Sequence, residues 1–100
     1  MAVLTAKQRQ FLRGLAHPLA PIVRVGKGGV TPSVVAETKK SLHSHELIKV
    51  RIEIDDPKER KAAADRLAAE TDSQLAGAIG KTAILYRERE EEPEIKLPKA

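Results

Sequence analysis

The most constraining stretch of this sequence is residues 47–54, where apolar and charged side chains alternate with a period of two. One face would carry Ile48, Val50, Ile52 and Ile54, and the other Lys49, Arg51 and Glu53. Successive side chains of a strand point to opposite faces, so this pattern predicts a β-strand with one buried face. Because an isolated strand is unstable in water, the chain must supply partner strands and a layer that covers them.

A first helix is predicted after Thr5, which can form a capping box with Gln8, and it should end before Pro18. Helical spacing assigns the core side to Leu4, Phe11, Leu12, Leu15 and Leu19. Arg9 and Arg13 are expected to project from the opposite face.

Two further helices follow at clear start signals. Thr31 and Pro32 are typical of an N-cap and a first helical residue, and Asp56 with Glu59 predicts a helix that runs to about Glu70. In the second helix the predicted inner residues are Val34, Val35, Thr38 and Leu42. Its predicted outward residues include Lys40 and His43, with Lys39 at the flank.

Short strands are predicted at residues 21–25, 74–79 and 82–86, the last two joined as a hairpin by Gly80 and Lys81. The resulting order, αβαβαββ, predicts an α/β fold: a two-layer sandwich with helices packed on a four-stranded mixed sheet. Residues 1–87 are expected to form this single domain. Residues 88–100, rich in glutamate and with two prolines, are expected to form a flexible charged tail.

Positive charge is concentrated in the first half of the chain. Residues 1–51 hold nine Lys or Arg and two acidic residues, a net charge of +7, whereas the whole chain carries +4. Such a surface attracts polyanions, because each phosphate contact releases condensed counterions. Phe11 and Tyr86 are the only aromatic residues, which argues against domains that stack RNA bases on aromatic rings.

Gly26 and Gly29 form a GxxG sequence between a predicted strand and a predicted helix, with Arg24 and Lys27 beside them. Glycines allow a phosphodiester backbone to approach the main chain closely, and the following helix N-terminus favours an anion. The GxxG loops of KH domains clamp nucleic-acid backbones in this way. The alternative is a glycine-rich turn without a ligand.

The sequence offers no catalytic or metal-binding constellation. Cysteine is absent, the three histidines lack a further ligand at suitable spacing, and Asp55 and Asp56 are explained by capping of the next helix. We therefore expect a protein that is not an enzyme and has no metal or cofactor. Without a membrane-spanning run or signal peptide, a soluble cytoplasmic location is expected.

Three motifs carry a family resemblance: residues 4–17, the Val25–Thr31 loop, and residues 79–87. Together they resemble a stand-alone bacterial CRM domain of the YhbY-like family over residues 4–87, in family order and spacing. The resemblance implies a fold similar to the C-terminal domain of translation initiation factor three. It also implies RNA binding, with ribosomal RNA of large-subunit precursors as the expected partner.

Carried onto this chain, the RNA-contacting loop is Gly26, Lys27, Gly28 and Gly29. Further basic contacts are expected from Arg9, Arg13, Arg24, Lys39, Lys40, Lys49 and Arg51, and Lys81 in the hairpin turn could also contact RNA. The free chain is expected to be a monomer. The alternative hypothesis is a protein-interaction module whose basic face binds an acidic partner and whose glycine loop is only a turn.

Overall fold

The computed structural model describes residues 3–99. Its elements are α1 (Ala6–Ala16), β1 (Pro21–Val25), α2 (Pro32–His45), β2 (Leu47–Ile52), α3 (Pro57–Glu70), β3 (Gln74–Ile79) and β4 (Thr82–Tyr86). This order confirms the predicted αβαβαββ arrangement. Strand β2 ends two residues earlier than predicted, although the N–H of Glu53 still donates to the carbonyl of Val25 at 2.8 Å.

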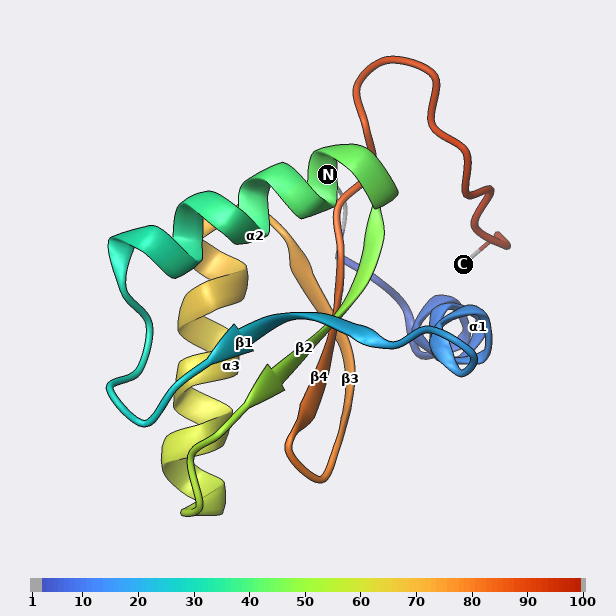
Figure 1. The fold of residues 1–100 in the computed structure, drawn as a ribbon. Coiled ribbons are helices and arrows are strands. Elements are labelled where there is room, and N and C mark those ends of the chain that lie inside the picture. Colours follow the sequence, from blue (N-terminus) through green and yellow to red (C-terminus); the bar gives the residue numbers. More distant parts are fainter. Residues whose placement is uncertain (1–2, 100) are drawn as a thin grey trace.

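The strands form one four-stranded sheet in the order β1-β2-β4-β3 (Figure 1). Strand β1 runs parallel to β2, and β4 runs antiparallel to both β2 and β3. The predicted mixed sheet and β3–β4 hairpin are therefore confirmed. Strands β1 and β3 are the two edges.

Helices α2 and α3 cover one face of the sheet and enclose the larger apolar core. Its buried residues are Val23, Val25, Leu42, Ile48, Val50, Ile52, Ala64, Leu67, Ala68, Ala83 and Leu85. The alternation predicted for residues 48–52 is thus confirmed, as is the inward position of Thr38 and Leu42 on α2. Alanines on α3 let that helix pack close to the strands.

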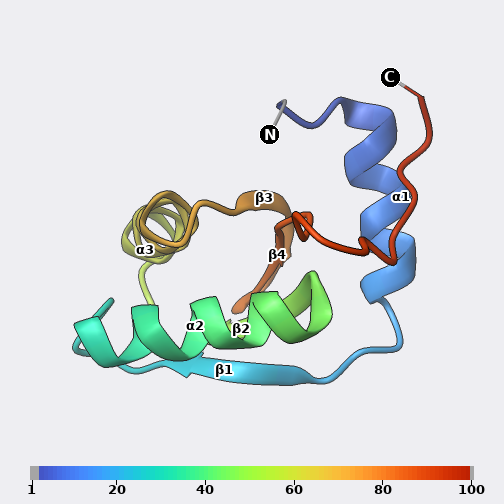
Figure 2. The same cartoon turned by 90° about the horizontal axis from the view of Figure 1, so that it is seen from above.

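Helix α1 lies on the other face of the sheet, as Figure 2 shows. A second core cluster joins Leu4, Leu12, Ala16, Leu47, Ala76, Ile84 and Tyr86. The predicted capping box is present, because Thr5 and Gln8 exchange side-chain to main-chain hydrogen bonds at 3.0 and 3.1 Å. The two-layer description therefore fits α2 and α3, while α1 adds a partial layer on the opposite side.

The predicted core side of the first helix is confirmed for Leu4 and Leu12, which are buried, but is wrong for its other apolar residues. Phe11, Leu15 and Leu19 are 39%, 42% and 39% exposed. The side that faces the sheet carries Leu12 and Ala16 together with the two arginines, which were expected to project away from it. These four residues share one stripe because they follow the i, i+3, i+4, i+7 spacing.

Small residues on β3 explain this orientation. The aliphatic stem of Arg13 lies against Gly77, where a Cβ atom would be only 2.5 Å from Cδ of the arginine. Its Nη1 donates to the carbonyl of Ala76 at 3.3 Å, and Nη1 of Arg9 donates to the carbonyl of Leu4 at 2.8 Å. Long basic side chains can cover apolar surface with their stems in this way.

The C-terminal segment, residues 88–99, contains no helix or strand but contacts the domain. Ile95 and Leu97 pack against the second core cluster, and the carbonyl of Pro98 accepts a hydrogen bond from Nε2 of Gln8 at 3.0 Å. The segment therefore makes apolar contacts and a hydrogen bond to the domain that its acidic composition does not predict. Its flexibility stays a prediction, and residues 1–2 and 100, at the ends of the predicted domain and tail, lie outside the described residues.

Candidate functional site

The GxxG sequence forms a tight turn between β1 and α2. The N–H of Gly29 donates to the carbonyl of Gly26 at 3.0 Å, which places Lys27 and Gly28 at the exposed corner. Gly29 has φ 85°, a conformation that favours glycine. Gly26 has no positive φ and open space where a Cβ would lie, so the chain's own packing does not require glycine there.

Three loops meet at one end of the sheet: residues 26–31, 53–56 and 80–81 (Figure 1). The N–H of Ile52 donates to the carbonyl of Lys81 at 2.7 Å, and Nζ of Lys81 contacts Oδ1 of Asp55 at 2.8 Å. The hydrogen bond from Glu53 to Val25 joins the second loop to the end of β1, where the first loop begins. We call this region the loop end.

A row of side chains crosses the sheet beside the loop end, on the face opposite α2 and α3. It runs across all four strands through paired positions: Arg24, Arg51, Thr82 and Ile79. Helix α1 packs farther along this face, so the row stays accessible. The Arg24 side chain is 79% exposed and that of Arg51 is 41% exposed.

The carboxyl groups at the loop end are held in their charged forms. A hydrogen bond from Nε of Arg51, at 2.6 Å, lowers the pKa of Glu53 despite some desolvation, and the charges of Arg51, Lys81 and Arg24 lower it further. The pKa of Asp55 is lowered by the hydrogen bond and charge of Lys81, and then by Lys27 and Arg60. Both acids thus lie in a positive field.

The structure brings together only part of the predicted site. The Gly26–Gly29 turn is part of the loop end, and Arg24 and Arg51 are paired on the strands beside it. Lys39 and Lys40 are exposed on α2, on the other side of the sheet, although the GxxG turn leads directly into that helix. Arg9 and Arg13 lie on α1, away from the turn.

Two basic residues have positions that the sequence does not reveal. Nζ of Lys49 donates to the carbonyl of His17 at 3.0 Å and so holds the α1–β1 connection. Arg60 was not predicted as a site residue. Its place at the start of α3 is visible in the sequence, but its contact with the loop end depends on how β2 turns into that helix.

Within residues 3–99, no helix is long and apolar enough to span a membrane. The same residues hold no group of three or more His, Cys, Asp or Glu side chains placed to bind a metal ion. What the loop end does offer is main-chain N–H groups, open space beside glycine, and clustered cations. These features suit an extended anionic chain.

Comparisons with known proteins identify a family and relatives named as RNA-binding proteins. Residues 4–87 match the profile of the CRS1 / YhbY (CRM) domain. A Bacillus subtilis protein named probable RNA-binding protein YqeI is 41% identical over 96 residues, which are 96% of this chain and 100% of that protein. A Haemophilus influenzae protein named RNA-binding protein is 40% identical over 99 residues, 99% of each chain.

The fold also matches a solved structure. The solution structure of a Staphylococcus aureus protein, SAV1595, described as a candidate RNA-binding protein, superposes with a TM-score of 0.87 at 38% sequence identity. The match covers 96% of this chain and 100% of that one.

Proposed function

Because the chain belongs to the CRS1/YhbY (CRM) domain family, we propose that it is a non-catalytic RNA-binding protein that holds RNA phosphates at the loop end. The observation that carries the proposal is the GxxG turn, which has open space beside Gly26 and Lys27 at its exposed corner, while Lys27, Lys81 and Arg60 all act on Asp55 of the neighbouring loop. The family match and the names of the relatives support RNA as the polyanion.

The proposed contacts combine close approach of the RNA backbone with attraction by nearby cations. The RNA backbone approaches the turn at Gly26 and Gly28, where no side chain blocks it. Lys27 and Arg24 lie beside the turn, and Arg51 is paired with Arg24 across the two strands, where both arginines are near Glu53. Since phosphate contacts position a nucleic acid without reading its bases, selectivity comes mainly from RNA shape.

The proposed RNA is ribosomal RNA in precursors of the large subunit. This part rests on the resemblance to stand-alone bacterial members of the family, and a cytoplasmic location belongs to the same proposal. The outer face of α2, with Lys39 and Lys40, and the arginines of α1 are proposed as secondary contacts. A long structured RNA could reach both faces from the loop end, since the turn lies at the edge between them.

The test compares aspartate variants in binding a labelled fragment of large-subunit ribosomal RNA at two salt concentrations. Gly26→Asp with Gly28→Asp places charge at the turn, at positions that have no positive φ. Gly14→Asp, on exposed α1, is the control for the single variant Gly26→Asp, because each adds one aspartate at a position with open space around it. Circular dichroism confirms that each variant is folded.

We expect the two turn variants to lose the salt-sensitive complex and the control to keep most of it. Equal binding by Gly26→Asp and Gly14→Asp would contradict phosphate contact at the turn. In that case the protein-interaction hypothesis, in which the glycines form only a turn, becomes the better explanation of the basic face.

A further inference from the structure

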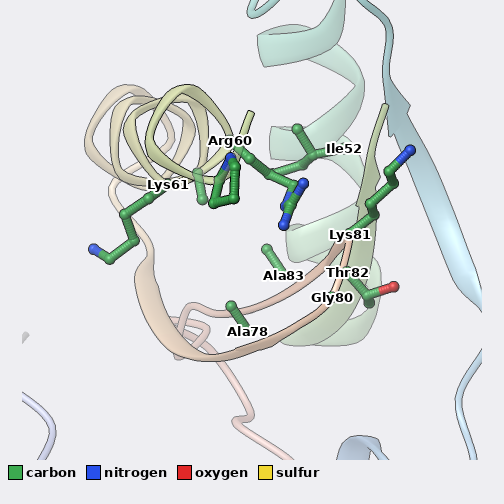
Figure 3. A pocket seen from close by; sticks show the side chains of 10 residues that line it. Ile52, Arg60, Lys61, Ala78, Gly80, Lys81, Thr82 and Ala83 are labelled. Atoms are coloured by element: carbon green, nitrogen blue, oxygen red, sulfur yellow. The ribbon is translucent and has the colours of Figure 1, made fainter. Parts of the chain in front are cut away.

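A small hollow lies at the loop end, between the first turns of α3 and the β3–β4 hairpin (Figure 3). Its volume is about 170 Å³. The apolar part of its lining comes from Ile52, Pro57, Ala64, Ala78 and Ala83. Three cations, Arg60, Lys61 and Lys81, stand around it.

The hollow exists because several of the side chains around it are small. Ala78 and Ala83 are paired neighbours on β3 and β4, and Ala64 approaches them from α3. An apolar cavity of roughly 150 Å³ can take one benzene molecule. The hollow therefore has the size and the polarity for a single flat ring, although it opens to solvent.

Arg60 differs from the other two cations. Lys61 is paired with Asp65 at 2.8 Å and Lys81 with Asp55 at 2.8 Å. Nη1 of Arg60 donates instead to the main-chain carbonyls of Ile54 and Asp55, at 2.9 and 3.0 Å. Within residues 3–99, no carboxylate forms an ion pair with it.

The guanidinium group of Arg60 is thus fixed by two main-chain carbonyls, and among the described residues it forms no direct ion pair, although its charge contributes to lowering the pKa of Asp55. Figure 3 shows it reaching from α3 toward the space between Ile52 and Ala83, whereas Lys61 points away. Unstacked RNA bases stack on arginine planes as well as on aromatic rings. The aromatic residues of this chain lie elsewhere, since Tyr86 is fully buried and Phe11 is on α1.

We propose that this hollow takes one unpaired base of the bound RNA, stacked against the guanidinium plane of Arg60. The inference rests on the proposed function and extends it from phosphate contact to base contact. Lys81, at the rim, contacts Asp55 in the middle loop, and Glu53 of that loop bonds to Val25, beside the GxxG turn. A strand held at the turn can therefore continue to the hollow.

The experiment compares two probes of equal length and charge: a dodecamer of oligouridylate, and an abasic ribose-phosphate dodecamer. Binding of both is measured for the unaltered protein and for three variants. Ala78→Leu fills the hollow from an exposed position on an edge strand, without changing charge. Arg60→Lys keeps the positive charge but removes the planar guanidinium group. Ala62→Leu is the control, because Ala62 is exposed on α3 and does not line the hollow.

The unaltered protein should bind the base-bearing dodecamer about tenfold more tightly than the abasic one, the typical effect of stacking one base. Ala78→Leu and Arg60→Lys should lose most of this preference, and Ala62→Leu should keep it. Equal binding of both probes by the unaltered protein would overturn the inference and leave phosphate binding intact. A preference that survives in Ala78→Leu would also overturn it, because the base would then lie outside the hollow.

Absence of binding to either dodecamer would likewise overturn the inference. The proposed function is judged separately, by the ribosomal RNA fragment and the variants at Gly26 and Gly28. A failure of the base contact can therefore be distinguished from a failure of the proposed function.

Discussion

The carboxylate of Glu46 accepts a hydrogen bond at 3.0 Å from the main-chain N–H of Ile95, which lies 49 residues further along the chain. The same carboxylate accepts the N–H groups of Glu94 at 2.7 Å and Arg89 at 2.9 Å. Glu46 is fully buried, and a buried carboxylate is tolerated only with such partners. The end of α2 and the C-terminal segment are thus one structural unit.

Glu46 also has an unusual main-chain conformation. It is the C-cap of α2, with φ 61° and ψ −41°, a region that non-glycine residues rarely adopt and that costs free energy. Its main-chain carbonyl accepts the N–H of Arg87 at 2.9 Å. The hydrogen bonds on both its side chain and its main chain hold this conformation in place.

We predict that Glu46→Gln lowers the free energy of unfolding by roughly 2 kcal/mol, the scale of hydrogen bonds to a charged group. A glutamine has one acceptor oxygen, and its amide hydrogens would face main-chain N–H donors. Urea denaturation measures the difference, with Glu37→Gln, on an exposed part of the same helix, as the control. A change no larger than that of the control would contradict a structural role for the carboxylate.

The same residue predicts a pH dependence. Burial alone would raise the pKa of Glu46, but the N–H groups of Arg89, Ile95 and Glu94 and the charge of Arg89 hold it below the ordinary value of 4.5. A carboxyl whose pKa is lower in the folded state stabilises the fold above its unfolded pKa. That contribution is lost as the pH falls through the folded value.

The stability gap between the unaltered protein and Glu46→Gln should therefore be constant near neutral pH and shrink below about pH 4.5. Subtracting the variant removes most of the contribution of Glu53 and Asp55, whose pKa values are also lowered. Urea denaturation from pH 7 to pH 3 measures the gap. A gap that widens toward acid pH would show that the sign is wrong.

A third prediction concerns Arg13 and Gly77, which lie in contact between α1 and β3. A Cβ at Gly77 would lie 2.5 Å from Cδ and 2.9 Å from Cγ of the arginine, so Gly77→Ala must displace that side chain. We expect a loss of about 1 kcal/mol in the free energy of unfolding, within the usual range for overpacking. In the Arg13→Ala background the same change should cost almost nothing, because the space is then empty and alanine restricts the unfolded chain.

A double-mutant cycle on these two residues measures the coupling. Additive effects would mean that the arginine stem does not occupy the space beside Gly77. Such a result would also reopen the question of which face of α1 meets the sheet.

The contrast between α1 and the rest of the fold shows what this sequence could predict. Helix starts at Thr5, Thr31 and Asp56 are local, since each cap involves residues only three positions apart. The sequence also predicts strand β2, because buried and exposed residues alternate along the strand itself. The sequence does not predict the orientation of α1, because that orientation depends on contacts with Ala76 and Gly77, which are more than sixty residues away.

The same distinction between local and distant contacts applies to the candidate site and to Glu46. The GxxG turn is a local motif, and it forms a turn between strand and helix with a positive φ at Gly29 but not at Gly26. The role of Glu46 as an anchor is not local, because its three side-chain partners are main-chain groups that the sequence does not distinguish. In the sequence Arg60 is an ordinary helix residue. Only the structure shows that it lies beside a hollow lined by alanines of α3, β3 and β4.

The last prediction uses salt dependence to determine which basic residues contact RNA. Removing one phosphate contact reduces the slope of log K against log salt by about one. Lys27→Gln, at the corner of the GxxG turn, should therefore flatten the slope for the ribosomal RNA fragment by about one. Lys7→Gln, exposed on α1, removes the same charge away from the turn and should leave the slope nearly unchanged.

The double variant Lys39→Gln, Lys40→Gln then tests the outer face of α2. A flatter slope would mean that the RNA passes around the edge of the sheet and reaches both faces. An unchanged slope would confine the RNA to the loop end and the row through Arg24 and Arg51. If Lys27→Gln and Lys7→Gln gave the same slope, the turn would be contributing only to the general positive field, and direct phosphate contact at Lys27 would be wrong.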